Sequence, residues 1–182
     1  MTEPIVYRQA ERHELDHAVR WATSEGWNPG IADADVFWET DPFGFVVAEL
    51  DGEVVAAGSI VAYGDVHGFM GFFIVRPDLR GHGIGRDFWE WRKNTLLARL
   101  RLGAAIGMDG VLDMVPFYAA GGFELSHRNI RMTGTPDAGV TCDAVTEIAE
   151  IDMGALNRFD RRHFGFDRNA FLQRWIGADG TT

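Results

Sequence analysis

The chain has 182 residues, of which 46% are hydrophobic and 12% aromatic, enough apolar material for one packed domain with an appendage or for two small lobes. Its 27 acidic residues outnumber 17 basic ones, and the formal net charge of -10 argues against a nucleic-acid-binding protein. The single cysteine, Cys142, rules out an internal disulfide and fits a reducing compartment. The N-terminus has no apolar signal core, and no run of about 20 apolar residues is present. We therefore expect a cytoplasmic protein that does not enter a membrane.

The first part of the chain alternates strand and helix signals. Residues 5–9 predict a short strand, and residues 11–25 carry apolar side chains at helical spacing before a stop at Gly26. Residues 32–40 predict a second helix, which ends at the breaker Asp41-Pro42. The turn between these two predicted helices holds Trp27 and Asn28.

The middle of the chain reads as three strands followed by a helix. The strand-like runs are 45–50, 54–63 and 69–75, and Asp51-Gly52 between the first two is a strong hairpin signal. The apolar spacing then changes to steps of four and three over 84–102, which indicates one buried stripe of a helix. Beyond it we predict a short strand at 103–107, a short helix at 114–122 and a last long strand at 123–133.

This order of elements predicts a mixed-sheet α/β domain over residues 1–135. Residues 133–139 have the composition of a linker. Residues 136–182 predict a strand followed by helices, an order that repeats the opening of the chain. The C-terminal region is therefore either part of this domain or the start of a second, similar lobe.

A glycine-rich stretch, VRPDLRGHGIGR, occupies residues 75–86 between the predicted strand and the predicted helix. A helix that begins near Ile84 has backbone N–H groups without intrahelical partners, and these suit an anion such as a phosphate. Glycines at 81, 83 and 85 allow close approach and left-handed backbone, while Arg80 and Arg86 add positive charge. The alternative is that the glycines serve a backbone turn alone.

Two nucleotide-binding motifs do not fit this stretch. The dinucleotide fingerprint G-x-G-x-x-G fails because position 86 is arginine. A P-loop fails because no Gly-Lys-Ser/Thr sequence follows the glycines. The ligand of the loop is therefore expected to be a different phosphate-containing molecule.

The loop resembles the Arg/Gln-x-x-Gly-x-Gly/Ala motif of the GNAT (GCN5-related N-acetyltransferase) superfamily, filled here by Arg80, Gly83 and Gly85. A second motif of that superfamily, Phe-Tyr-x-x-x-Gly-Phe, is matched by residues 117–123. The order of predicted elements also matches over about 4–134. The last 45 or so residues resemble, more weakly, the second lobe of tandem-lobe members.

The resemblance implies the GNAT fold, a mixed, mostly antiparallel sheet with a splayed parallel strand pair and flanking helices. It implies that acetyl-CoA is the co-substrate, without a metal. The pantetheine is then expected beside Phe73, Ile74 and Val75, with the Phe73 and Val75 amides near the thioester carbonyl. The residues expected around the pyrophosphate are Arg80, Gly81, His82, Gly83, Ile84, Gly85 and Arg86.

The resemblance also implies a catalytic role for Tyr118, as the general acid that protonates the leaving thiolate. The general base stays unassigned, because the run 69–75 has no acidic residue; Asp65, His67, Asp109 and Asp113 lie in neighbouring turns or strand ends. The acceptor is expected to be a small-molecule or peptide amine. Trp27, Asn28 and Trp38 are the residues expected to bind it, with core packing as the alternative role of the two tryptophans.

Two other functions remain open. His13-Glu14-Leu15-Asp16-His17 matches the zinc-protease signature H-E-x-x-H, but the rest of the extended signature is missing, with Arg20 and Thr23 in place of glycine and histidine. Because no general base is identified, the protein can also be a non-catalytic acyl-CoA-binding or regulatory module. Formation of a homodimer is left open.

Overall fold

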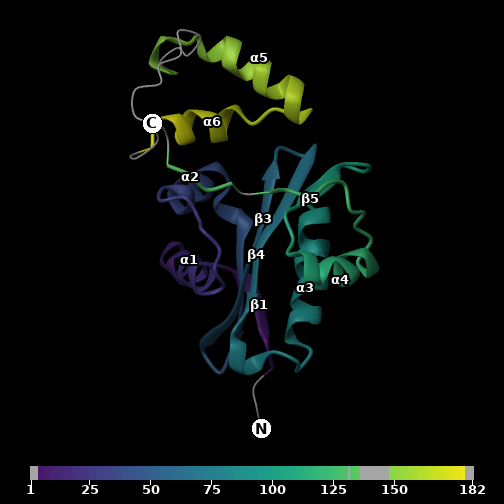
Figure 1. Cartoon of the computed structure of the whole chain (residues 1–182). Coiled ribbons are helices and arrows are strands. Elements are labelled where there is room, and N and C mark those ends of the chain that lie inside the picture. Colours follow the sequence, from purple (N-terminus) through teal and green to yellow (C-terminus); the bar gives the residue numbers. More distant parts are fainter. Residues whose placement is uncertain (1–3, 131, 136–147, 179–182) are drawn as a thin grey trace.

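The computed structural model describes residues 4–130, 132–135 and 148–178. Its centre is a five-stranded sheet in the order β1-β2-β3-β4-β5 (Figure 1). The strands are β1 (Val6–Gln9), β2 (Phe45–Leu50), β3 (Glu53–Tyr63), β4 (His67–Val75) and β5 (Ala105–Met108). All neighbours pair antiparallel except β4 and β5, which pair parallel. The predicted mixed, mostly antiparallel sheet is confirmed.

Helices cover both faces of the sheet, α1 (Leu15–Ser24) and α2 (Asp33–Thr40) on one side and α3 (Ile84–Leu97) and α4 (Val115–Ala120) on the other (Figure 1). Successive strand residues point to opposite faces, so β2 supplies side chains to two hydrophobic clusters. Phe45 and Val47 of β2 pack with Leu15 of α1. Val46 of the same strand packs in the other cluster, with Leu96 of α3.

A β-bulge interrupts β4 where it pairs with β3. Ser59 pairs with Gly71 and Ala57 with Ile74, so two residues of β4, Phe72 and Phe73, lie opposite Gly58 alone. Phe72 has a left-handed backbone, with φ of 48°. Strand alternation restarts one residue out of step after such an insertion.

The bulge reverses which residues of β4 face α3. Before it, Met70 belongs to the cluster under α3, and a Cβ on Gly68 would lie 2.8 Å from Leu96 Cδ2. After it, Phe73 and Val75 pack against that same cluster. This change of phase explains why the sequence FMGFFIV lacks a simple alternation.

Strand β5 pairs with only the first part of β4. The parallel register runs from His67 opposite Ala105 to Met70 opposite Met108, where β5 ends. Strand β4 continues to Val75, still paired with β3. The pairing of β4 with β5 therefore ends immediately before the bulge. This is the splayed parallel strand pair that the resemblance implied.

The described C-terminal residues form α5 (Met153–Phe164) and α6 (Asn169–Ile176), beside the end of β3 and the start of β4 (Figure 1). Phe171 and Leu172 of α6 form a small buried cluster with Val36 of α2. Phe166 stacks on His67 with ring centroids 4.0 Å apart. The helices predicted here are present, whereas the strand predicted before them falls largely on 136–147, outside the described residues. A division of the chain at residue 135 stays a prediction.

The strand predicted at 123–133 is wrong for the described part of that segment. Residues 123–130, 132 and 133 are not in a strand, and Leu125, Ile130 and Met132 are 58%, 83% and 85% exposed. A strand needs a neighbouring edge for its backbone hydrogen bonds and a surface to cover with its apolar side chains. The sequence pattern shows the propensity but not whether such an edge is within reach.

Candidate functional site

The glycine-rich loop connects the end of β4 to the start of α3. Gly81 and Gly83 have φ of 83° and 90°, in the left-handed region that other residues adopt at a cost of about 1–2 kcal/mol. A Cβ on either glycine would meet no atom of the described residues within 4 Å. Backbone conformation rather than lack of space therefore requires glycine here, and the loop is open to a ligand.

Gly83 is the N-cap of α3, so the first amides of the helix point into this loop. The amide of Arg86 already donates to the Gly83 carbonyl at 2.9 Å, which takes it out of the set expected to meet a pyrophosphate. The amides of Ile84 and Gly85 precede it in the first turn. Together with the positive end of the helix dipole they favour an anion.

The side chain of Arg80 braces the loop from outside. Its Nε donates to the Val75 carbonyl at 2.9 Å, and its Nη2 donates to Glu25, the C-cap residue of α1. His82 Nδ1 lies 3.0 Å from the Arg80 carbonyl oxygen. The guanidinium therefore lies beside the loop, but a carboxylate of the protein shares its charge.

The amides of Phe73 and Val75 face away from β3. The Arg76 amide donates to the Val55 carbonyl of β3 at 2.9 Å, and amide directions alternate along an extended strand. The Val75 carbonyl accordingly accepts from Arg80 instead of from β3. Ile74, the residue between them, is only 4% exposed. The edge of β4 that carries the two amides is the one that β5 leaves uncovered.

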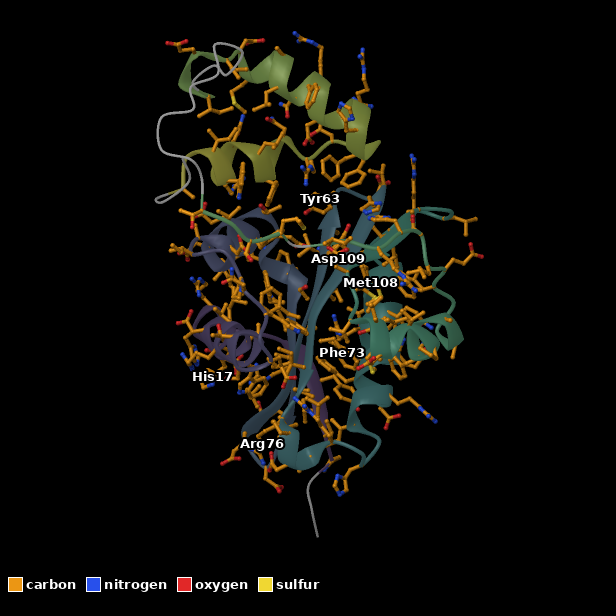
Figure 2. All side chains as sticks on the ribbon, viewed as in Figure 1. His17, Tyr63, Phe73, Arg76, Met108 and Asp109 are labelled. Atoms are coloured by element: carbon orange, nitrogen blue, oxygen red, sulfur yellow. The ribbon has the colours of Figure 1, made fainter. Side chains whose placement is uncertain are left out.

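An aromatic cluster brings Phe73 and Tyr118 to the same place. Trp89 of α3 lies 5.7 Å from Phe73 and 5.2 Å from Tyr118, measured between ring centroids. Phe117 completes the group, 6.2 Å from Phe73. Figure 2 shows Phe73 between the sheet and α3, with Met108 and Asp109 at the end of β5.

Tyr118 packs directly on the backbone that follows β5. A Cβ on Gly110 would lie 2.4 Å from Tyr118 Cε2, so only glycine allows this contact. Burial raises the pKa of Tyr118, and the positive charge of Arg92 offsets part of that rise. The phenol therefore keeps its proton at neutral pH and is available as a proton donor.

Arg92 of α3 is a residue that the sequence analysis missed. It is 0% exposed, and its Nη2 donates to the Ser59 and Gly71 carbonyls at 2.7 Å each. Burial lowers its pKa from the usual value. Its position four residues after Phe88 on the buried stripe of the helix was the available signal, because a charge on such a stripe demands a partner.

Of the residues expected to bind an acceptor, Trp27 reaches the bulge. Its ring packs edge-on against that of Phe72, with 6.5 Å between the ring centroids. This contact lies on the face of the sheet opposite the one that carries Phe73. Asn28 beside it is exposed. Trp38 instead stacks on Phe45 at 5.9 Å and packs against the hydrophobic cluster under α1, which favours a structural role.

The neighbouring ionisable residues do not single out a general base. Asp109 follows β5 directly, and its Oδ1 accepts from Asn129 Nδ2 at 3.1 Å. His67 begins β4, stacks on Phe166 and has its pKa lowered by burial. Asp65 is an exposed turn residue, and Asp113 is exposed on the short 3₁₀ helix Leu112–Met114.

The H-E-x-x-H sequence marks the start of a helix. Glu14 accepts from Arg8 Nη1 and Nη2 at 2.8 and 2.7 Å and from the Glu11 amide at 2.8 Å, and these bonds lower its pKa. His13 and His17 are exposed. Within 4–130, 132–135 and 148–178, no group of three or more His, Cys, Asp or Glu side chains could hold a metal ion. Over the same residues, no helix has the length and apolar character needed to span a bilayer.

Comparison with known proteins identifies relatives of this chain. Holothin acyltransferase from Pseudoalteromonas sp. (strain SANK 73390) is 30% identical over 174 residues, which are 95% of this chain and 58% of that protein. The chain therefore spans less than two thirds of the length of this relative.

Solved structures share the fold at low sequence identity. A protein from Pyrococcus horikoshii described as an acetyltransferase superposes with a TM-score of 0.71 at 19% identity, over 94% of this chain and 61% of its own. N-acetylglutamate synthase from Neisseria gonorrhoeae, solved with coenzyme A and N-acetyl-glutamate, superposes with a TM-score of 0.53 at 16% identity, over 69% of this chain and 29% of its own. The model of the Acetyltransferase (GNAT) family matches residues 12–123, from the first helix to the end of the Phe-Tyr motif. That match covers more than half of the chain, which therefore belongs to the Acetyltransferase (GNAT) family.

Proposed function

We propose that this protein is an N-acetyltransferase that moves the acetyl group of acetyl-CoA to a primary amine by direct attack. The observation that carries the proposal is the parting of β4 from β5 beside the glycine loop, with Tyr118 next to the gap. Membership of the GNAT family and a relative named as an acyltransferase support it.

The co-substrate fits two features of the chain. The left-handed glycines and the first amides of α3 suit its pyrophosphate, since neither Gly81 nor Gly83 carries a side chain into the loop. The uncovered edge of β4 suits its pantetheine arm, which contains amide groups that can hydrogen bond to an extended backbone. Residues 73–75 would bind this arm along the edge of β4 that lies beyond the end of β5.

The residues near the bulge supply the elements of acyl transfer. The amine nitrogen forms a bond to the thioester carbonyl carbon as the carbon–sulfur bond breaks, and Tyr118 gives its proton to the departing sulfur. The Phe73 and Val75 amides stabilise the negative charge that develops on the carbonyl oxygen, a contribution of about 3 kcal/mol for each oriented donor. The excess proton of the amine leaves to water or to a base that is still unassigned.

The acceptor is proposed to approach from the side of α1 and α2. Trp27 supports this, because it contacts Phe72 on the face of the sheet opposite Tyr118. An aromatic ring at this position favours a cationic amine or an apolar group attached to it. Asn28 is the adjacent polar side chain, whereas the packing of Trp38 gives it less support as a contact.

Calorimetric titration with acetyl-CoA, with NAD as the negative control, tests the proposal. The variants are Gly83→Glu and the matched control Gly103→Glu. Both glycines have left-handed backbone, with φ of 90° and 82°, and a Cβ at either would meet nothing within 4 Å. The two substitutions therefore cost similar backbone strain, but only Gly83→Glu puts a carboxylate beside the expected pyrophosphate.

The expected result is binding of acetyl-CoA to the wild type and to Gly103→Glu, with loss of binding in Gly83→Glu. NAD should bind none of the three proteins. Absence of acetyl-CoA binding in the wild type, or equal affinity in both variants, would contradict the proposal.

A non-catalytic acyl-CoA-binding module is the second candidate, and the unassigned base is the observation that favours it. The two candidates differ in turnover. Incubation of the protein with acetyl-CoA and a panel of primary amines, followed by mass spectrometry, should reveal an N-acetylated product if the protein is an enzyme. Tight binding with no product from any amine would favour the module.

A further inference from the structure

The bulge in β4 decides which backbone groups face the gap between β4 and β5. Amide directions alternate along a strand, so a shift of one residue would turn the amides of Phe73 and Val75 towards β3. Those two amides are the donors proposed for the thioester carbonyl. Whatever holds the bulge in its register therefore also holds the reaction site.

The guanidinium of Arg92 contacts residues of both strands at the bulge. Its Nη2 bridges the carbonyls of Ser59 and Gly71, the last regular pair before the bulge, at 2.7 Å each. Its Cζ would lie 2.4 Å from a Cβ on Gly58, the single residue opposite the bulge. Its Cζ also lies over the Phe73 ring, 5.1 Å from the centroid.

The cost of this arrangement argues for a specific role. Arg92 is fully buried, and its Nε and Nη1 have no hydrogen-bond partner among the residues that the structure describes. An ion buried without an opposite charge loses its hydration, and this loss is unfavourable even after its surroundings relax. Apolar side chains fill the neighbouring positions of the same helix stripe, Phe88 and Leu96, at no such cost. Packing alone would therefore favour an apolar residue at position 92.

We propose that Arg92 is a positioning residue for acyl transfer. By binding the Ser59 and Gly71 carbonyls and filling the space against Gly58, it fixes the bulge in β4 and directs the Phe73 amide towards the thioester carbonyl. This inference rests on the proposed function, because it concerns the same site. It adds a residue that neither glycine loop nor Phe-Tyr motif contains.

The test measures the bound carbonyl directly and needs no acceptor. The ¹³C resonance of [1-¹³C]acetyl-CoA is recorded free and bound, since hydrogen bonds from the two amides polarise the carbonyl and move its resonance downfield. Calorimetry with coenzyme A, which lacks the acetyl group, reports binding by the rest of the site. The variants are Arg92→Met, which keeps an unbranched apolar side chain and removes the guanidinium, and Arg92→Lys, which keeps the positive charge.

Arg99→Met is the matched control. Arg99, which follows α3, also donates to a carbonyl of β3: its Nη1 lies 2.9 Å from the Ile60 oxygen. Unlike Arg92, it forms an ion pair with Asp41, and Ile60 lies outside the bulge, in the regular pair with Met70. This control should lose stability and keep the wild-type carbonyl shift. It separates damage to the sheet from damage to the bulge.

We expect Arg92→Met to lose the downfield shift while its affinity for coenzyme A stays within about threefold of wild type, and Arg92→Lys to recover part of the shift. If Arg92→Met does not fold, Gly58→Ala replaces it, because its Cβ displaces the guanidinium; it too should lose the shift. A shift retained in the folded variant, or equal losses of affinity for coenzyme A and acetyl-CoA, would overturn the role of Arg92. A wild type that binds neither molecule would instead refute the proposed function.

Discussion

The two halves of β4 differ in how completely their backbone is used. His67–Met70 is paired with β3 on one side and with β5 on the other. Ile74 and Val75 are paired with β3 alone, and they follow a bulge that contains a left-handed residue and has a buried cation beside it. One strand thus joins a fully bonded segment to a segment with an open edge.

This difference separates stability from chemistry within a single element. In the first half, Met70 and Gly68 face the densely packed cluster below α3, where an added atom would lower the stability of the fold. The second half keeps the amides of Phe73 and Val75 directed away from β3, where a ligand can use them. Substitutions in the first half should therefore change unfolding, and substitutions around the second half should change catalysis.

Tyr118→Phe should have the largest effect, because it removes only the hydroxyl group proposed to protonate the leaving sulfur. We expect kcat to fall about 10²- to 10⁴-fold, the usual contribution of a general acid, with the Kd for acetyl-CoA unchanged. Steady-state kinetics with an amine from the acceptor panel measure it, and Tyr63→Phe, at the far end of β3, is the control. An unaltered kcat would remove Tyr118 from the mechanism.

Gly68→Val should destabilise the protein without changing its affinity for acetyl-CoA. Its Cβ would lie 2.8 Å from Leu96 Cδ2 and 2.9 Å from Leu100 Cδ1, so the core is overpacked at a cost of about 1–3 kcal/mol. Urea unfolding measures the loss. Gly107→Ala, on the partner strand, is the control, because its Cβ would lie at an ordinary 3.4 Å from Phe69. A changed acetyl-CoA affinity in Gly68→Val would break the separation between the two halves.

The left-handed backbone at Phe72 should reverse a general rule. Alanine normally stabilises a strand relative to glycine by about 0.5–1 kcal/mol. At position 72, where φ is 48°, glycine relieves a strain of about 1–2 kcal/mol that alanine retains. Both variants lose the same contact with Trp27, so Phe72→Gly should be more stable than Phe72→Ala in urea unfolding. The ordinary order would mean that the bulge relaxes when the ring is removed.

The ionisation of Tyr118 should show the smallest effect, a change in the pKa of one side chain. Burial raises its pKa above the usual value of about 10, so the folded protein keeps the phenol protonated at a pH where the unfolded chain begins to lose it. The stability linked to this group is therefore lost as pH rises above about 10. The tyrosinate absorbance of wild type minus that of Tyr118→Phe should show an apparent pKa above 10, and a lower value would place the phenol in water.

Features that depend on neighbours in the chain could be predicted from the sequence. The glycine loop needs left-handed residues between a strand and a helix, and the spacing of its glycines indicates that turn. The Asp51-Gly52 hairpin and the helical stripe through Ile84 and Phe88 are equally local. These signals arise from backbone torsion and side-chain period, which act over a few residues.

Features that depend on distant partners could not. The strand predicted at 123–133 has suitable residues but lies in no ladder over its described part, and the bulge at Phe72 depends on the register that β4 adopts against β3. Arg92 looks like one more charge on a helix until the fold buries it against Gly58 and Gly71.

The sequence by itself thus determined the family, the loop and the order of the elements as far as α4, because short motifs and periodicity encode them. Only the tertiary structure decided that β5 stops at Met108, that Arg80 pairs with Glu25 and that the buried Arg92 donates to the Ser59 and Gly71 carbonyls. Each of these depends on which groups meet across the sheet. Hydrogen-bond partners and burial are properties of the packed chain, and residue spacing alone does not contain them.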